Sequence, residues 1–173
     1  IGILADMLAA AINPNVGGWA LSPVATEIEK QAVRWLGELI GFPTAGSGLF
    51  VSGGNMANMV GFAAARAAQA PADMRTRGLA QTAPALTAYV SRETHTWVEK
   101  AADLFGIGTD AIRWIGTGKD YRIDVAELRR RIQQDLADGK QPFCVVGTAG
   151  TVSTGTVDPI RELRALCDEF GLW

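Results

Sequence analysis

A strand, a helix and a second strand are predicted by residues 86–115, which read LTAYVSRETHTWVEKAADLFGIGTDAIRWI. Residues 86–90 form a short apolar run, and residues 112–115 form another. Between them, residues 96–105 have helical spacing, and Thr96 and Glu99 stand at the spacing of a capping box. Two strands joined by a crossover helix predict neighbouring parallel strands in one sheet.

The same alternation continues towards the carboxyl end of the chain. Residues 124–138 predict a helix with Asp124 and Glu127 as a capping pair, and residues 143–147 predict a strand. Residues 159–170 predict a helix, because Asp158 is a good N-cap residue and Pro159 suits the first helical position. Strands that alternate with helices of this length are typical of an α/β domain with a mainly parallel sheet flanked by helices.

Upstream, two helices are expected. Residues 26–42 are amphipathic, and Thr26 and Glu29 have capping-box spacing. Residues 56–70 are small and almost without a polar face, so we expect that helix to be deeply buried. An apolar run at residues 49–51 precedes it, and we interpret this run as a strand.

Composition excludes several classes of protein. The chain has 173 residues, 48% of them apolar, and a formal net charge of -2. An ordinary single domain with a core is therefore expected, without the basic surplus of a nucleic-acid binder. No apolar run is long enough for a membrane span. Two cysteines make no disulfide framework and one histidine makes no histidine-rich metal site, which indicates a reducing, cytoplasmic compartment and no metal.

Three predicted strand ends carry polar or glycine-rich residues, and ligands of parallel sheets bind at such ends. Ser52-Gly53-Gly54-Asn55 can cradle a phosphate or carboxylate with backbone amides at a helix start, or it can be a tight connection without a ligand. The second strand end is the segment 91–95, which ends in His95. This histidine can stack on a planar ring or move a proton, or it can be a structural histidine. The third is the hydroxyl-rich stretch 147–156, which can bind a polar ligand or solvate its own turn.

The nucleotide-binding motifs do not match these segments. Gly118-Lys119 is followed by Asp120 instead of serine or threonine, which excludes a Walker loop. Nor do the four lysines fit a buried nucleophile, because each lies on a helix, just past a helix end or in a turn that we expect to be solvated.

At these residues the sequence resembles the group II pyridoxal-phosphate-dependent amino-acid decarboxylases, a family that includes the aromatic-amino-acid, glutamate, tyrosine and histidine decarboxylases. The resemblance runs through nearly the whole chain, with its motifs in the family's order. They are WALSP at 19–23, TEIE at 26–29, WLG at 35–37, SGGNMAN at 52–58, the segment 91–101 around His95, and the segment 147–159.

The resemblance implies a large domain of the fold type I (aspartate-aminotransferase) class that binds pyridoxal 5'-phosphate. By position, Gly54 and Asn55 would hold the cofactor phosphate, and His95 would stack on the pyridine ring and act in catalysis. Thr148 and Thr151 would lie on the loop that lines the cofactor. Animal aromatic decarboxylases have a further threonine where this chain has Val152, so one hydroxyl contact is absent.

The resemblance also implies a division of the chain and a partner. Residues 1–47 would form an N-terminal loop and helix on the substrate and dimer side, and residues 48–173 would form part of the cofactor-binding large domain. In the family, an aspartate that pairs with the pyridine nitrogen and the Schiff-base lysine lie beyond the position of Trp173. We therefore expect this chain to be an N-terminal piece that is inactive alone, and the full-length protein to be a homodimer.

The implied reaction is decarboxylation of an L-amino acid to its amine and carbon dioxide. The substrate side chain stays open, because the loop 15–18 before Trp19 is smaller than in the aromatic-specific animal enzymes. Two alternatives stay open as well. One is another fold type I enzyme, such as an aminotransferase or a cysteine-desulfurase-like lyase, and the other is a non-catalytic phosphate-binding α/β module.

Overall fold

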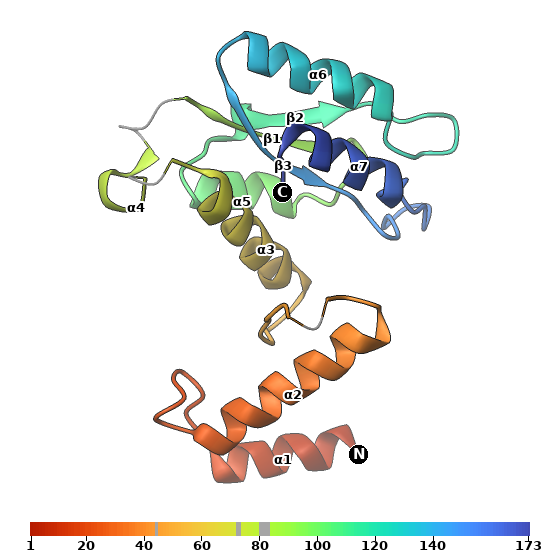
Figure 1. The fold of residues 1–173 in the computed structure, drawn as a ribbon. Coiled ribbons are helices and arrows are strands. Elements are labelled where there is room, and N and C mark those ends of the chain that lie inside the picture. Colours follow the sequence, from red (N-terminus) through yellow and green to blue (C-terminus); the bar gives the residue numbers. More distant parts are fainter. Residues whose placement is uncertain (44, 72–73, 80–83) are drawn as a thin grey trace. The chain divides into compact units, whose positions relative to one another are not determined.

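The computed structural model describes residues 1–43, 45–71, 74–79 and 84–173, and the chain divides into two compact units, Ile1–Ser52 and Gly53–Trp173. The first unit holds α1 (Gly2–Ile12) and α2 (Pro23–Leu39) (Figure 1). The second unit holds, in chain order, α3 (Gly54–Gln69), α4 (Met74–Arg77), β1 (Leu86–Ser91), α5 (Trp97–Leu104), the 3-10 helix η2 (Thr109–Ala111), β2 (Ile112–Ile115), α6 (Val125–Ala137), β3 (Gln141–Val146) and α7 (Ile160–Phe170).

The first unit differs from the expected pattern at two places. Helix α1 was not predicted, because its own residues are apolar around the whole circumference apart from Asp6. Such a sequence shows no apolar stripe that would mark an amphipathic helix. Helix α2 begins at Pro23 with Ser22 as N-cap, earlier than the predicted start at Thr26. Proline suits the first helical position, where its missing N–H has no partner to lose. The Thr26 hydroxyl donates to the carbonyl oxygen of Ser22 at 2.8 Å and caps nothing.

The second unit confirms the predicted α/β fold. Its sheet is parallel, with strand order β2-β1-β3. Every residue of the central strand β1 is buried, as expected for a parallel strand covered on both faces. The final residues of the chain also pair with β3, because Trp173 N donates to Phe143 O and Val145 N donates to Trp173 O.

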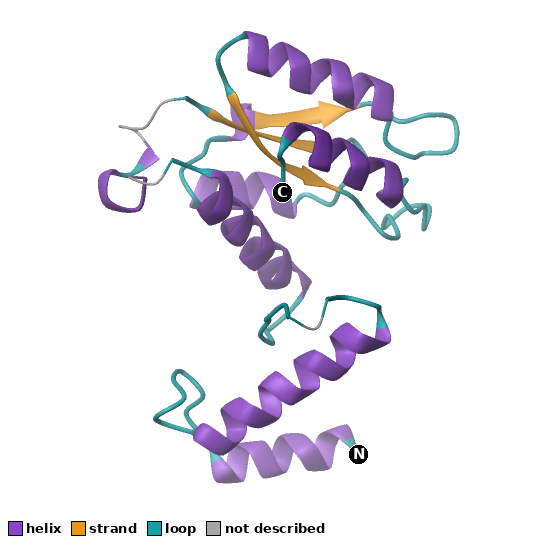
Figure 2. Ribbon diagram, viewed as in Figure 1, coloured by secondary structure: helices purple, strands orange, loops and turns teal. Residues whose placement is uncertain are grey.

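Helices cover both faces of this sheet (Figure 2). On one face, Ala88 and Val90 of β1 pack in a cluster with residues of α3 and α5. On the other face, Tyr89 packs in a second cluster with residues of α6 and α7. Successive strand side chains point to opposite faces, so one short strand supplies both cores.

Three local predictions were wrong. Residues 49–51 form no strand. Helix α3 buries only Phe62 and Ala65 among its described residues, instead of its whole circumference. Finally, Asp158 is not the N-cap of α7, a position that Pro159 occupies. The Asp158 carboxylate accepts hydrogen bonds from two distant backbone amides instead.

Candidate functional site

A cavity of about 360 Å³ lies at the carboxyl ends of β1 and β3. Three segments line it: the start of α3, the turn after β1, and the loop after β3. Four of the five predicted site residues contribute to its wall, namely Gly54, Asn55, His95 and Thr148. Segments far apart in the sequence are brought together because all three lie at one edge of the parallel sheet.

The start of α3 presents free backbone amides to this cavity. Gly53 is the N-cap and offers no side chain to the first turn, whose amides have no partner within the helix. A Cβ atom added at Gly53 or Gly54 would meet no atom of the described residues within 4 Å. Packing therefore does not require these glycines, and their missing side chains leave room for a ligand to approach the backbone.

His95 is held by the turn that follows β1. Its Nδ1 accepts a hydrogen bond from the backbone N of Trp97 at 3.2 Å. Trp97 is itself buried against the edge of Phe62, with ring centroids 5.9 Å apart. Because Nδ1 is the acceptor, the neutral imidazole carries its proton on Nε2, which leaves one N–H for a ligand.

Thr94 is a lining residue that sequence reasoning missed. It is 6% exposed, and its hydroxyl oxygen has no hydrogen-bond partner among the described residues. A buried hydroxyl without a partner is unusual in a folded protein and is consistent with a polar group bound beside it. Its place directly before His95 in a strand-end turn was the available signal. Asn58 and Glu93 also line the cavity.

The two predicted threonines of the loop after β3 differ in their relation to the cavity. Thr148 lines the cavity, whereas Thr151 does not. The Thr151 hydroxyl lies 2.7 Å from that of Thr154 and accepts from the backbone N of Thr156 at 3.1 Å. Thr151 therefore organises the loop from inside, while its two neighbours, Gly150 and the exposed Val152, line the cavity.

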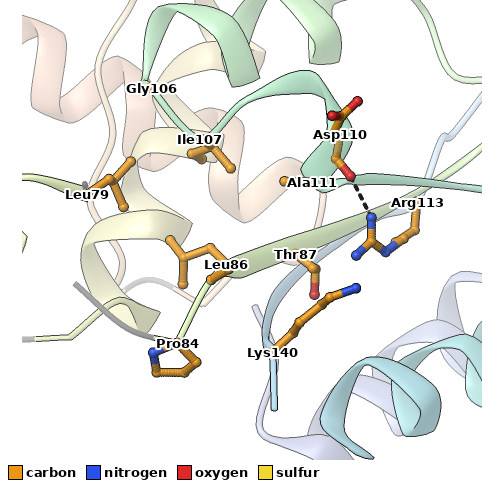
Figure 3. Close-up of a pocket in the computed structure, with 11 residues that line it drawn as sticks. Leu79, Pro84, Leu86, Thr87, Gly106, Ile107, Asp110, Ala111, Arg113 and Lys140 are labelled. Carbon is orange, nitrogen blue, oxygen red and sulfur yellow. Dashed lines mark hydrogen bonds between the residues drawn. The ribbon is translucent and has the colours of Figure 1, made fainter. Parts of the chain in front are cut away.

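A second cavity, of about 500 Å³, lies at the amino ends of the strands (Figure 3). Its cations are already engaged by protein groups: Arg113 pairs with Asp135 and donates to the carbonyl oxygen of Asp110, and Lys140 lies 3.4 Å from Asp135. Parallel sheets bind ligands at the other edge. The cavity at the carboxyl ends is therefore the better candidate site.

Other kinds of site find no support in the described part of the chain. No cluster of three or more histidine, cysteine or acidic residues in those ranges is arranged to hold a metal ion. All four lysines lie in described segments, and none lines the cavity at the carboxyl ends. Among the described helices, none has both the length and the apolarity needed to cross a bilayer.

Comparison with known proteins gives a consistent result. Residues 1–173 match the family described as "Pyridoxal-dependent decarboxylase conserved domain". The chain is 36% identical over 173 residues to the aromatic-L-amino-acid decarboxylase of Bacillus atrophaeus, covering all of this chain and 34% of that protein. It is 33% identical over 171 residues to the acidic amino acid decarboxylase GADL1 of Bos taurus, covering 99% of this chain and 32% of that protein.

Solved structures show the same likeness. Mouse CSAD superposes with a TM-score of 0.90 at 30% identity, over 99% of this chain and 35% of that chain. Oryza sativa TDC, solved with PLP and tryptamine, gives a TM-score of 0.86 at 33% identity, over 99% of this chain and 36% of that chain. The chain thus spans about a third of the length of the relatives it matches.

Proposed function

The chain belongs to the family of pyridoxal-dependent decarboxylases, and from that membership we propose that the full-length protein decarboxylates an L-amino acid to its amine and carbon dioxide. The cofactor of this family is pyridoxal phosphate. The observation that carries the proposal is the cavity that gathers Gly54, Asn55, His95 and Thr148 at one edge of the sheet. Relatives named as aromatic and as acidic amino acid decarboxylases are similarly close, so the proposal names no substrate side chain.

The residues present fit this cofactor. Open space beside Gly54 and the free amides of the first turn of α3 suit a phosphate group, so Gly54 and Asn55 would hold it. The imidazole of His95 would lie against the pyridine ring, and the wall at Thr148 would bound it. Thr151 would act indirectly, through the shape of the loop that its hydroxyl organises.

These proposed contacts assign one part of the reaction to the cofactor and another to the protein. When bound, pyridoxal phosphate supplies a conjugated ring that accepts the electron pair left by the departing carboxylate. The chain contributes orientation: the start of α3 fixes the anionic end, and His95 fixes the plane of the ring. The Nε2–H of His95 is a proton donor within the cavity, because Nδ1 is engaged by Trp97.

The test of this function is product analysis of the full-length protein with pyridoxal phosphate, an α-keto acid as amino-group acceptor, and a panel of aromatic and acidic L-amino acids together with L-cysteine. Stoichiometric carbon dioxide and amine are expected from at least one substrate. Keto-acid or alanine production would indicate an aminotransferase or a desulfurase. Phosphate binding without turnover would indicate a non-catalytic module.

The 173-residue chain by itself is expected to form no stoichiometric, site-specific covalent adduct with the cofactor. None of Lys30, Lys100, Lys119 and Lys140 lines the cavity, and the lysine that bonds to the aldehyde would have to come from elsewhere in the protein. The measurement is borohydride reduction in the presence of pyridoxal phosphate, followed by peptide mass spectrometry. A stoichiometric adduct on one of the four would contradict the assignment, and scattered substoichiometric labelling of surface lysines would agree with it.

We expect the full-length protein to be a homodimer. Neither α1 nor α2 buries a residue, and both expose large apolar side chains, including Leu4, Met7, Ile28 and Trp35. Such surface is costly in water and needs cover from other protein, and we propose that a second copy of the full-length protein supplies part of it. Sedimentation of the full-length protein should give the mass of a dimer, and a monomer at micromolar concentration would contradict this expectation.

We place the protein in the cytoplasm. Cys144 and Cys167 are both free and buried, and burial raises the pKa of the Cys144 thiol to about 12. A protonated, buried thiol is a packing residue rather than a redox group, which suits a reducing compartment.

A further inference from the structure

A buried carboxylate outside the cavity wall connects two loops at the carboxyl edge of the sheet. Asp158 is 3% exposed. Its Oδ1 accepts a hydrogen bond from the backbone N of Ile123 at 2.9 Å, and its Oδ2 accepts one from the backbone N of Thr148 at 2.8 Å. The backbone N of Asp158 donates in turn to the carbonyl oxygen of Thr148 at 2.9 Å. One oxygen therefore serves the loop before α6, 35 residues away in the sequence, and the other serves the start of the loop after β3, in which Asp158 itself lies.

The two loops differ in how firmly the rest of the fold holds them. Ile123 is 3% exposed and packs in the cluster between the sheet and α6. Thr148 belongs to the cavity wall, where the adjoining glycine-rich segment is closed by the bridge between Ala149 and Val157. Asp158 thus connects a loop rich in glycine and threonine to a buried core residue.

We propose that Asp158 is a positioning residue, which holds Thr148 and the adjoining wall in the arrangement that receives the cofactor. This inference rests on the proposed function. Asp158 does not itself line the cavity, so it acts through the backbone of Thr148 and not by contact with a ligand. Both of its partners are N–H donors, and a carboxylate is the side-chain group of this size that accepts through two oxygens.

The change Asp158→Asn isolates this feature, because asparagine has nearly the same shape but only one acceptor oxygen. Its NH₂ group would face the N–H of either Ile123 or Thr148, so one hydrogen bond is lost and two donors oppose each other. Losing this charge-assisted hydrogen bond would release the backbone of Thr148 from its place in the cavity wall, and we expect that displacement to weaken cofactor binding by about 10-fold or more.

Asp124→Asn is the matched control. Asp124 is also a loop aspartate, but it accepts a single backbone hydrogen bond, from Glu127 N at 2.9 Å to Oδ1. Asparagine is as good an N-cap as aspartate, so the same chemical change removes nothing at this site. The two variants therefore carry the same chemical change at an exposed cap that serves one amide and at a buried carboxylate that serves two.

The experiment titrates the full-length apoprotein and both variants with pyridoxine 5'-phosphate, the alcohol analogue that cannot bond to a lysine. Asp158→Asn is expected to raise its dissociation constant by about 10-fold or more, and Asp124→Asn to leave it within about 2-fold of the wild type. Equal affinities for wild type and Asp158→Asn, with only a lower melting temperature, would make Asp158 merely structural. A wild-type protein that does not bind the analogue would instead contradict the proposed function and, with it, the positioning role.

Amide hydrogen exchange on the wild-type apoprotein gives a readout that needs neither cofactor nor a folded variant. The amides of Ile123 and Thr148 are expected to be protected as strongly as their hydrogen-bonded neighbours in the sheet. Where Asp158→Asn folds, at least one of the two should lose protection, while the amides of β1 keep theirs. Exchange of both wild-type amides at the rate of unprotected loop amides would overturn the proposal.

Discussion

Replacement of His95 by alanine in the full-length protein is expected to lower kcat by about 10²- to 10⁴-fold, the usual range for loss of a positioned proton-transfer group. The variant removes both the ring that would fix the cofactor plane and the Nε2–H within the cavity. The phosphate contacts that we propose for Gly54 and Asn55 lie on another element, so the affinity for pyridoxine 5'-phosphate should fall far less than kcat. Steady-state kinetics and analogue titration on the same preparation make the comparison.

His95→Asn is the control for the local fold of the turn. An asparagine oxygen can accept the hydrogen bond from Trp97 N that Nδ1 accepts in the wild type. This variant should keep the turn but lose turnover as alanine does. Small and equal effects of both variants on turnover and on affinity would favour a binding module without catalysis.

The second large effect concerns stability. Asp135 is fully buried, and Arg113, whose side chain is 11% exposed, donates to it from Nε at 2.8 Å and from Nη2 at 3.1 Å. Tyr89 donates a third hydrogen bond at 2.8 Å. Asp135→Ala leaves a nearly buried guanidinium without its partner, which should cost about 3–5 kcal/mol in the free energy of unfolding. Chemical denaturation measures the loss.

Asp138→Ala, near the end of the same helix, is the matched control. Its side chain is 46% exposed, its contact with Lys140 is 4.0 Å long, and it accepts one exposed hydrogen bond, from Gln134 Nε2 at 2.8 Å, so a change within about 0.5 kcal/mol is expected. Equal effects of the two substitutions would contradict the assigned role of the buried cluster.

Asp135 also predicts a pH dependence. Burial alone would raise the pKa of Asp135, but the hydrogen bonds from Arg113 and Tyr89 outweigh it and hold the pKa below its usual range. A carboxyl whose pKa is depressed by folding stabilises the protein above its unfolded pKa, and this contribution is lost as the pH falls towards the folded pKa. The melting temperature of the wild type should therefore decrease as the pH is lowered below about 4, and that of Asp135→Ala should decrease less steeply.

The sheet and its helices could be predicted because each element carries its own periodicity. The limits of β3 were predicted less well, because the strand was expected at residues 143–147 and lies at Gln141–Val146, with Pro142 inside it. The structure includes this proline in the strand and shows a register shift between Thr87 and Ala88 opposite it. The burial of α3 was overestimated. An apolar sequence indicates that a helix must be covered by other residues, but it does not indicate which part of the protein covers it.

The candidate site was predicted in its location more than in its details. Strand-end position predicted that His95 and Thr148 lie at one cavity, because chain topology brings such ends together, whereas Gly54 and Asn55 line it from the start of α3, which residues 49–51 precede without forming a strand. It failed for Thr151, since whether a hydroxyl faces a ligand or its own loop depends on turn geometry. Asp158 was taken for a helix cap for the same reason: its partners, Ile123 and Thr148, are distant in the sequence and leave no local signal.

The most direct test of the account is a crystal structure of the full-length protein with pyridoxal phosphate bound. We expect phosphate oxygens at about 3 Å from backbone N atoms of the first turn of α3, at Gly54 and Asn55, and the pyridine ring lying face to face with the imidazole of His95. Cofactor density elsewhere in the protein, with both the start of α3 and His95 free of it, would contradict the account.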